Sequence, residues 1–104
     1  MRDIPAGGPA DNSAMAARAM ARIAEQAGDL TQARHHLDVA LRVARRRGSR
    51  HEEATTRWHA ARIEAAQGDR LLARAQLDLA LESFAVMDMR WHLAEALALL
   101  RQLD

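Results

Sequence analysis

The sequence contains no cysteine and no tyrosine, and aromatic residues make up only 3% of its 104 residues. Without cysteine the chain has no disulfide scaffold, no thiol nucleophile and no Cys-ligated zinc site. The low content of aromatic residues, with only five glycines, argues against a β-sandwich, a barrel or a collagen-like chain. These absences leave a small helical domain as the class to test.

A charge excess and a long apolar run are missing as well. Fifteen basic residues against fourteen acidic residues give a formal net charge of +1, so no bulk electrostatic attraction draws the chain to nucleic acid. No stretch reaches the ~18 uninterrupted apolar residues that a membrane span needs, and the first residues lack the apolar core of a signal peptide. We therefore expect a cytoplasmic protein that has no membrane segment.

The residues that are present favour helices. The chain is 49% hydrophobic and 28% charged, which is enough apolar material to form one small core. Every basic residue is an arginine, and alanine, leucine and arginine are all strong helix formers. Such arginine-rich and alanine-rich usage is typical of a high-GC bacterial genome.

A repeat of 40 residues organises the chain. Gly28-Asp29 recurs as Gly68-Asp69, and the residues that follow match at the same spacing. The matched pairs are Ala33 with Ala73, Arg34 with Arg74, Leu37 with Leu77, Asp38 with Asp78, Ala40 with Ala80 and Leu41 with Leu81. Upstream, Ala14, Ala54 and Ala94 share one repeat position. Self-similarity at a period of about 20–50 residues is the signature of a solenoid.

Apolar spacing and capping residues set the expected helices. Apolar residues recur at i, i+3, i+4 and i+7 between the glycines. Ser49 with Glu52 forms a capping-box pattern, Asp29 with Gln32 forms a similar one, and Gly48 fits the left-handed position that ends a helix. The pattern predicts a flexible lead-in at residues 1–10 and a domain at 11–104 with five helices. Their expected ranges are 11–27, 30–47, 50–67, 70–87 and 89–103, paired as hairpins 11–47 and 50–87 with a terminal helix at 89–103.

The repeated motif resembles a known family. Gly-Asp-x-x-x-Ala-x-x-x-Leu-x-x-Ala-Leu, at 28–41 and 68–81, is similar to the tetratricopeptide repeat (TPR) in its longer bacterial form of ~40 residues. The resemblance covers roughly residues 13–104 and implies an all-α, short, right-handed TPR-like solenoid of antiparallel hairpins. The sequence departs from the family where a large aromatic residue and a tyrosine are usual, because Ala17 or Arg57 and Ala24 or Glu64 stand there.

The resemblance also implies a function. Similar arrays occur in large bacterial transcription regulators and signalling ATPases, and residues 89–96 resemble their last repeat. The first helix of each hairpin lines the concave surface in such arrays. The repeat aligns Arg18 with Trp58 and Arg22 with Arg62, and arginine and tryptophan are enriched at binding hot spots.

Two interpretations of that first-helix surface stay open. In one, the chain is a non-catalytic protein–protein interaction module that binds a peptide or helix of a partner, with acidic character because arginine suits carboxylates. Its partner-binding residues are Arg18, Arg22, Trp58, His59 and Arg62. In the other, Trp58 packs in the core and the arginines are solvated.

The last predicted helix suggests an alternative function. Leucine and alanine continue most of the way round residues 89–103, including Leu93, Leu97 and Leu100. A helix that is apolar all round expects cover on more than one side. The chain therefore either forms a homodimer through these residues or is cut from a longer array.

The remaining candidate sites, formed by the arginine run, the histidines and the serines, have weaker support. The run from Arg42 to Arg50 could contact nucleic acid, but a helix C-terminus explains its cations and no aromatic residue is interleaved. His35 and His36 are adjacent and point about 100° apart on a helix, and His51 lacks a second ligand one turn away. The three serines form no nucleophile constellation. We expect no enzyme activity, no metal and no cofactor.

Overall fold

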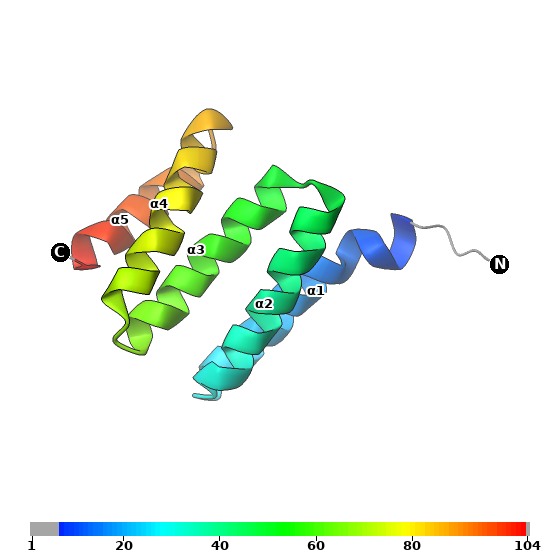
Figure 1. Ribbon diagram of the computed structural model, residues 1–104, viewed down its shortest axis with the longest axis horizontal. Coiled ribbons are helices and arrows are strands. Elements are labelled where there is room, and N and C mark those ends of the chain that lie inside the picture. The colour runs from blue at the N-terminus through cyan, green and yellow to red at the C-terminus, as the bar shows by residue number, and fades with distance from the viewer. Residues whose placement is uncertain (1–6, 104) are drawn as a thin grey trace.

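A computed structural model describes residues 7–103 as five α-helices, and residues 1–6 and 104 lie outside the described part (Figure 1). The helices are α1 (Gly7–Gln26), α2 (Leu30–Arg47), α3 (Arg50–Ala66), α4 (Arg70–Val86) and α5 (Arg90–Leu103). The described residues contain no β-strand. The prediction of an all-α chain with five helices is therefore confirmed for this part.

The bounds of α2 to α5 agree with the predicted ranges to within one residue. The first helix begins earlier than expected, at Gly7, so residues 7–10 of the expected lead-in are helical. Pro9 lies in the first turn of α1, where a missing N–H removes no hydrogen bond within the helix. The rest of the expected lead-in, residues 1–6, lies outside the described residues.

One backbone turn recurs every 20 residues and ends α1, α2, α3 and α4. Gly28, Gly48, Gly68 and Asp88 have φ angles of 81°, 70°, 87° and 55°, all in the left-handed region. Glycine reaches this region without a Cβ clash, so the prediction for Gly48 is confirmed. The fourth turn has the same conformation but carries an aspartate.

The capping predictions are confirmed at the residues that follow these turns. The Ser49 hydroxyl accepts a hydrogen bond from the Glu52 N–H at 3.2 Å, and the Asp29 carboxylate accepts one from the Gln32 N–H at 3.1 Å. Asp69 caps α4 in the same way through the Leu72 N–H. Each cap satisfies a backbone donor that the helix itself leaves without a partner.

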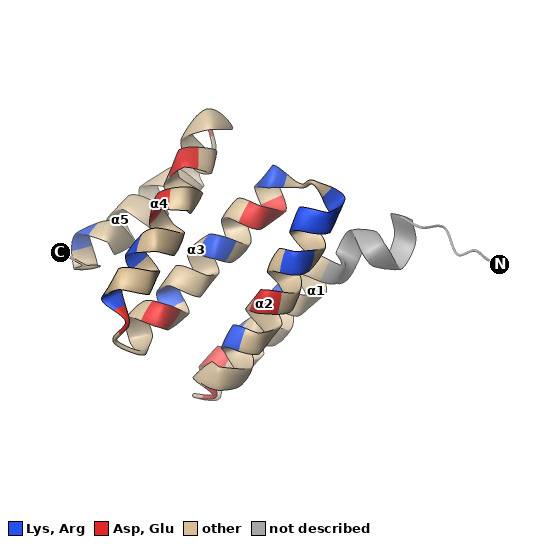
Figure 2. Ribbon diagram, in the orientation of Figure 1, with Lys and Arg blue, Asp and Glu red and all other residues tan. Residues whose placement is uncertain are grey.

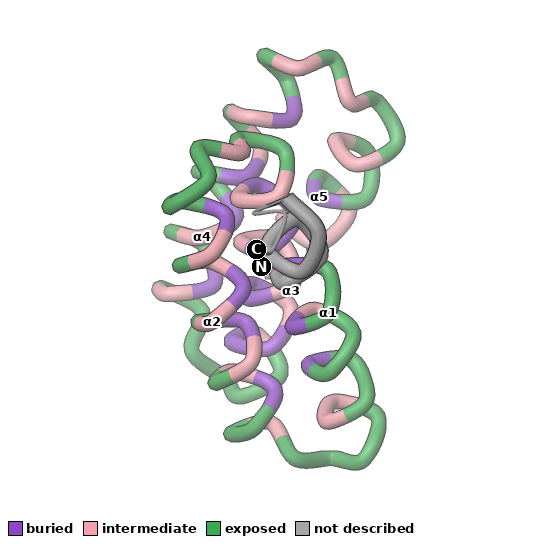
Figure 3. The backbone as a smooth tube through the Cα atoms, turned by 90° about the vertical axis from the view of Figure 1, so that its right-hand side faces the viewer, coloured by how far each residue is buried: buried purple, intermediate pink, exposed green. Residues whose placement is uncertain are grey.

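The helices pack as two antiparallel hairpins followed by α5. Helix α1 packs along α2, α3 packs along α4, and α5 packs on α4. Helix α3 is central, because it also contacts α1, α2 and α5. Figures 1 and 3 place α2 and α4 on one side of the molecule and α1 and α5 on the other. The shortest extent, 19 Å, matches about two helix diameters.

Small residues let the paired helices approach closely. Ala33 and Ala40 of α2 and Ala73 and Ala80 of α4 are fully buried, as their repeat positions predict. Leu37 and Leu77 are buried beside them. Close approach through alanine brings the helix backbones into dense van der Waals contact, which is how interiors gain packing energy.

Two clusters of buried residues connect the helices, and buried positions are purple in Figure 3. One joins the two hairpins through Ala21 of α1, Ala33 and Leu37 of α2, and Ala60 and Ile63 of α3. The other joins α3, α4 and α5 through the buried residues Ala54, Ala61, Leu77, Ala80, Phe84 and Ala96. The first cluster therefore holds the two hairpins together, and the second holds α5 on the second hairpin.

Candidate functional site

The residues predicted to bind a partner lie on one surface, which we call the α1–α3–α5 face. Helix α1 supplies Arg18 and Arg22, and α3 supplies Trp58, His59 and Arg62. Helix α5 completes this face with side chains that the sequence analysis did not assign to it: Trp91, His92, Glu95, Leu99 and Gln102. The sequence signal for α5 was the 40-residue repeat, which aligns Ala94 of α5 with Ala54 of α3 and Ala14 of α1.

Two of the three arginines on this face are paired with glutamates of a neighbouring helix. Arg18 donates a hydrogen bond to Glu52 of α3. Arg62 donates one to Oε2 of Glu25 in α1 at 2.9 Å. Both ion pairs cross between α1 and α3, so they position the two helices against each other. Among the described residues, Arg22 is exposed and has no ion-pair partner.

An aromatic cluster forms the centre of the face. The indole of Trp58 lies edge-on to Trp91, with ring centroids 6.0 Å apart at 86°, and edge-on to His92 at 6.1 Å. These are the favoured arrangements of aromatic pairs. Trp58 is half-buried and packs against the second core cluster, while Trp91 is 63% exposed. The buried Trp58 Nε1 has no hydrogen-bond partner in the described part of the chain.

His59 is held in its neutral form. Burial, reinforced by the positive charges of Arg62, Arg18 and Arg22, lowers the pKa of His59 to about 4. Its Nδ1 lies 3.0 Å from Nη1 of Arg62. A guanidinium has only donors, so Nδ1 accepts this hydrogen bond and the ring proton sits on Nε2. His59 therefore orients Arg62 and adds no positive charge near pH 7.

Two hollows indent the face between α3 and α5. The smaller, of about 190 Å³, is lined by Trp58, Arg62, Glu95, Ala98, Leu99 and Gln102. The larger, of about 400 Å³, shares Arg62, Leu99 and Gln102 and extends to Glu25 of α1. Ala98 stands one repeat after Trp58, and its small side chain leaves space where an indole stands in α3. The walls thus combine apolar carbon with a guanidinium, a carboxylate and an amide.

The structure bears on the packing of these side chains, which the second interpretation concerns. Trp58 does pack against the core, as the second interpretation expected, but it also lines the smaller hollow. The arginines are not simply solvated, because Arg18 and Arg62 are in ion pairs. The sequence could not show these pairs, since Glu25 and Arg62 are 37 positions apart.

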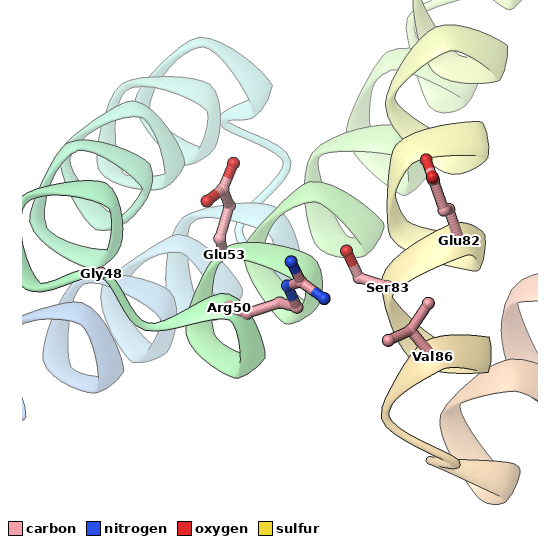
Figure 4. A pocket seen from close by; sticks show the side chains of 6 residues that line it. All are labelled: Gly48, Arg50, Glu53, Glu82, Ser83 and Val86. Atoms are coloured by element: carbon pink, nitrogen blue, oxygen red, sulfur yellow. The ribbon is translucent and has the colours of Figure 1, made fainter.

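A third hollow lies on the opposite side, between the α2–α3 turn and α4 (Figure 4). Its volume is about 390 Å³ and its lining is Gly48, Arg50, Glu53, Glu82, Ser83 and Val86. Figure 4 shows the Arg50 side chain reaching toward Ser83. Glu53 and Glu82 in its wall would repel the phosphates of a nucleic acid. The lining contains no aromatic residue on which a base could stack.

The arginine run occupies the end of α2. Arg45, Arg46 and Arg47 form its last turn and are exposed, and Figure 2 shows basic residues gathered where α2 ends and α3 begins. Cations in this position complement the helix dipole. Among the described residues, no group of three or more histidine, aspartate or glutamate side chains is placed to hold a metal ion.

Two residues of α3 that stand where the sequence departs from the family it resembles, Arg57 and Glu64, are charged. Arg57 donates hydrogen bonds to Gln76 of α4 at 2.9 Å and to Glu53 at 3.1 Å. Glu64 is fully buried, with Arg34 Nη2 of α2 at 3.1 Å from its Oε2. Burial raises the pKa of Glu64, Arg34 opposes this, and Asp69 and Asp38 add to it. Neither Glu64 oxygen accepts a hydrogen bond from the described residues.

The leucines of α5 point mainly into the protein. Leu93 and Leu100 pack against the second core cluster, and only Leu97 of the three residues predicted for self-association is exposed, at 38%. Helix α5 needs apolar residues on several sides because it contacts both α3 and α4. The apolar character of this helix is thus explained largely by packing within the chain.

Comparison of the chain with family models, with curated proteins and with solved structures gives no match. In the part of the chain that the structure describes, no helix is both long enough and apolar enough to span a membrane. The geometry of the α1–α3–α5 face is therefore what a functional assignment can be built on.

Proposed function

We propose that the chain is a non-catalytic, TPR-like protein–protein interaction module that binds a helix or extended peptide of a partner on its α1–α3–α5 face. The observation that carries this proposal is that Trp58 lies edge-on to the exposed Trp91 and lines the smaller hollow, which shares Arg62 with the larger one. Large aromatic side chains beside an arginine are the residue types that dominate binding energy at interfaces. The hollows are open, which suits a side chain of a partner better than a small metabolite.

The solenoid part of this proposal is supported by the repeat and by the order of contacts. Residues 28–41 and 68–81 match in sequence, and each such segment closes a helical hairpin. Helix α3 contacts both α1 and α5, whereas α2 and α4 have no contact with each other within the described chain. A solenoid whose first helices line one surface has this order.

The acidic preference of the partner rests on Arg22. Arg18 and Arg62 are neutralised by Glu52 and Glu25, so the face is not a broad cationic surface. Arg22 remains exposed beside this network and supplies one uncompensated guanidinium. We infer a partner that inserts an apolar anchor near Trp91 and places one carboxylate on Arg22.

The test is selection of binders from a display library of random peptides against the whole chain. Selected peptides should combine an apolar residue with Asp or Glu and should bind the Trp91→Ala and Arg22→Glu variants about tenfold or more weakly. Leu71→Ala, an exposed change on α4, serves as the matched control and should leave binding unchanged. Peptides that bind both face variants as tightly as the original chain would overturn the assignment.

The alternative function, a homodimer through α5, has less support. Leu93 and Leu100 are engaged with the core, which leaves Leu97 as the main exposed leucine of that helix. Leu97→Glu tests this alternative, because it should convert such a dimer to monomers without unfolding the chain.

A further inference from the structure

Helix α1 carries an exposed apolar surface that the sequence analysis did not identify. Met15, Met20 and Ile23 are 57%, 49% and 61% exposed. They lie in one sector, about 140° wide at 100° per residue, together with three exposed alanines, the last of which directly follows α1. The uncharged, exposed Gln26 lies in the same sector beside Met15. We call this sector the α1 apolar face; it consists of Met15, Ala16, Ala19, Met20, Ile23 and Ala27. A contiguous apolar surface of this kind marks a contact site.

The 40-residue repeat places an equivalent surface on α3. Forty residues on, Ala16, Met20 and Ile23 correspond to Thr56, Ala60 and Ile63 of α3. These α3 residues are buried, and Ala60 and Ile63 pack against the first hairpin through Ala21, Ala33 and Leu37. The face of α3 that holds the two hairpins together is therefore the face that α1 leaves uncovered. The α1 apolar face continues an interface that already exists in the chain.

We propose that a second copy of this chain covers the α1 apolar face, with the two α1 helices packed antiparallel about a twofold axis. The face contains no charged residue, so pairing it with its own copy buries no unpaired charge. A twofold contact is also the commonest arrangement of identical chains, and it requires a self-complementary surface.

The order of large and small residues supplies that complementarity. With the twofold axis passing between Ala19 and Met20, Met20 lies opposite Ala19 of the second copy, and Ile23 lies opposite Ala16. Large side chains then fill the spaces left by alanines on the facing helix, which is how closely packed helices interdigitate. The side of α1 that contacts α3 through Arg18 and Glu25 is turned away from this contact. The dimer therefore does not involve the two ion pairs between α1 and α3, and the proposal does not depend on the proposed function.

Light scattering over a concentration series tests the assembly. We expect the original chain to reach twice its monomer mass, and Ile23→Glu to raise the dissociation constant tenfold or more. Leu97→Glu is the control, because it alters the exposed leucine of α5 and should leave the dimer intact. Circular dichroism should show both variants folded, since both positions are exposed. A chain that stays monomeric at all concentrations would overturn the proposal, as would a dimer broken by Leu97→Glu and kept by Ile23→Glu.

The absence of cysteine makes a second, geometric test possible. Ala19→Cys places a thiol next to the twofold axis and should give disulfide-linked dimers in mild oxidant, because the two Cα atoms come within disulfide reach. Ala27→Cys is the matched control on the same face. Its thiols lie about 20 Å apart in the antiparallel pair, so it should not cross-link. Equal cross-linking at both positions would indicate parallel helices and contradict the proposed arrangement.

Discussion

At the scale of single residues, Glu64 is the clearest conflict between burial and charge. Among the described residues it is the only ionisable side chain that is fully buried, and Arg34 is its one counter-charge within ion-pair distance. Arg34 is itself partly exposed, so solvent weakens the attraction. The raised pKa of Glu64 means that its ionised form is less favourable in the folded chain than in the unfolded one.

The two partners of this pair should therefore respond in opposite ways. Glu64→Gln removes the desolvated charge and leaves Arg34 free to reach water, so the free energy of unfolding at about pH 7 should stay the same or rise. Arg34→Gln leaves the buried carboxylate without its counter-charge and should lower that energy by about 1–3 kcal/mol. Urea denaturation of both variants measures the difference.

The pH dependence of the same pair gives a check. Glu64 binds its proton more tightly in the folded chain, so the loss caused by Arg34→Gln is present at neutral pH and fades as acid protonates the carboxyl group. A loss that is equally large at acidic pH would show that Arg34 acts through packing alone.

His59 should make stability fall in mild acid. Its pKa is about 4 in the folded chain against an ordinary 6.5, so below pH 6.5 the unfolded chain binds the proton more readily. The folded chain should lose about 2 kcal/mol of unfolding free energy from this group between about pH 7 and about pH 5. Below the folded pKa the loss grows no further.

Substitution of His59 isolates its contribution to the pH dependence of the unfolding free energy. His59→Gln keeps a polar side chain that does not titrate, so its unfolding energy should vary less between the two pH values, measured by urea denaturation. Glu64 shifts the slope in the opposite direction, and it is present in both chains, so it cancels in the comparison. An unchanged slope in the variant would contradict the assigned protonation state of His59.

At the scale of helices and turns, the four left-handed positions differ in one residue. The first three turns have glycine at this position, Gly28, Gly48 and Gly68, whereas the fourth turn has Asp88, with φ of 55°. A residue with a Cβ in this region is strained by about 1–2 kcal/mol relative to the right-handed conformation. Asp88 accepts a hydrogen bond from Arg90 at 3.3 Å, but both side chains are exposed, so this pair contributes little.

Asp88→Gly should stabilise the chain by about 0.5–1 kcal/mol. Gly48→Ala is the matched change in the opposite direction. A Cβ built at Gly48 meets no atom within 4 Å, so its cost comes from the backbone conformation alone. Thermal denaturation should move the midpoint up for the first variant and down for the second. Midpoints that move in the same direction would exclude the backbone explanation.

The helices were predictable from sequence because their boundaries are local. Gly48 and the caps Asp29 and Ser49 each act within three or four residues of their own position. The direction of the α5 leucines was not predictable in the same way, because Leu93 and Leu100 contact residues of α3 and α4. For the same reason the sequence indicated which residue types form the face but not the ion pair between Glu25 and Arg62.

At the scale of the whole molecule, the same repeat position is buried in the second hairpin and exposed in the first. Ile63 joins the two hairpins in the first core cluster, while Ile23, the residue 40 positions earlier, is exposed. Ile63→Ala should lower the free energy of unfolding by about 2–5 kcal/mol. Ile23→Ala, measured at low protein concentration, should change it by less than about 0.5 kcal/mol. Similar losses at both positions would contradict the assignment of Ile63 to the hairpin contact.

Binding of a partner to the α1–α3–α5 face, as proposed above, has a direct reporter in the chain. Both of its tryptophans, Trp58 and Trp91, lie on this face, so two indole N–H signals in a ¹⁵N NMR spectrum monitor it without interference from other surfaces. Titration with a selected acidic peptide should shift both indole signals and the Arg22 backbone amide, while amides of the exposed side of α4 stay in place. Saturable binding that leaves both indole signals unmoved would contradict the account.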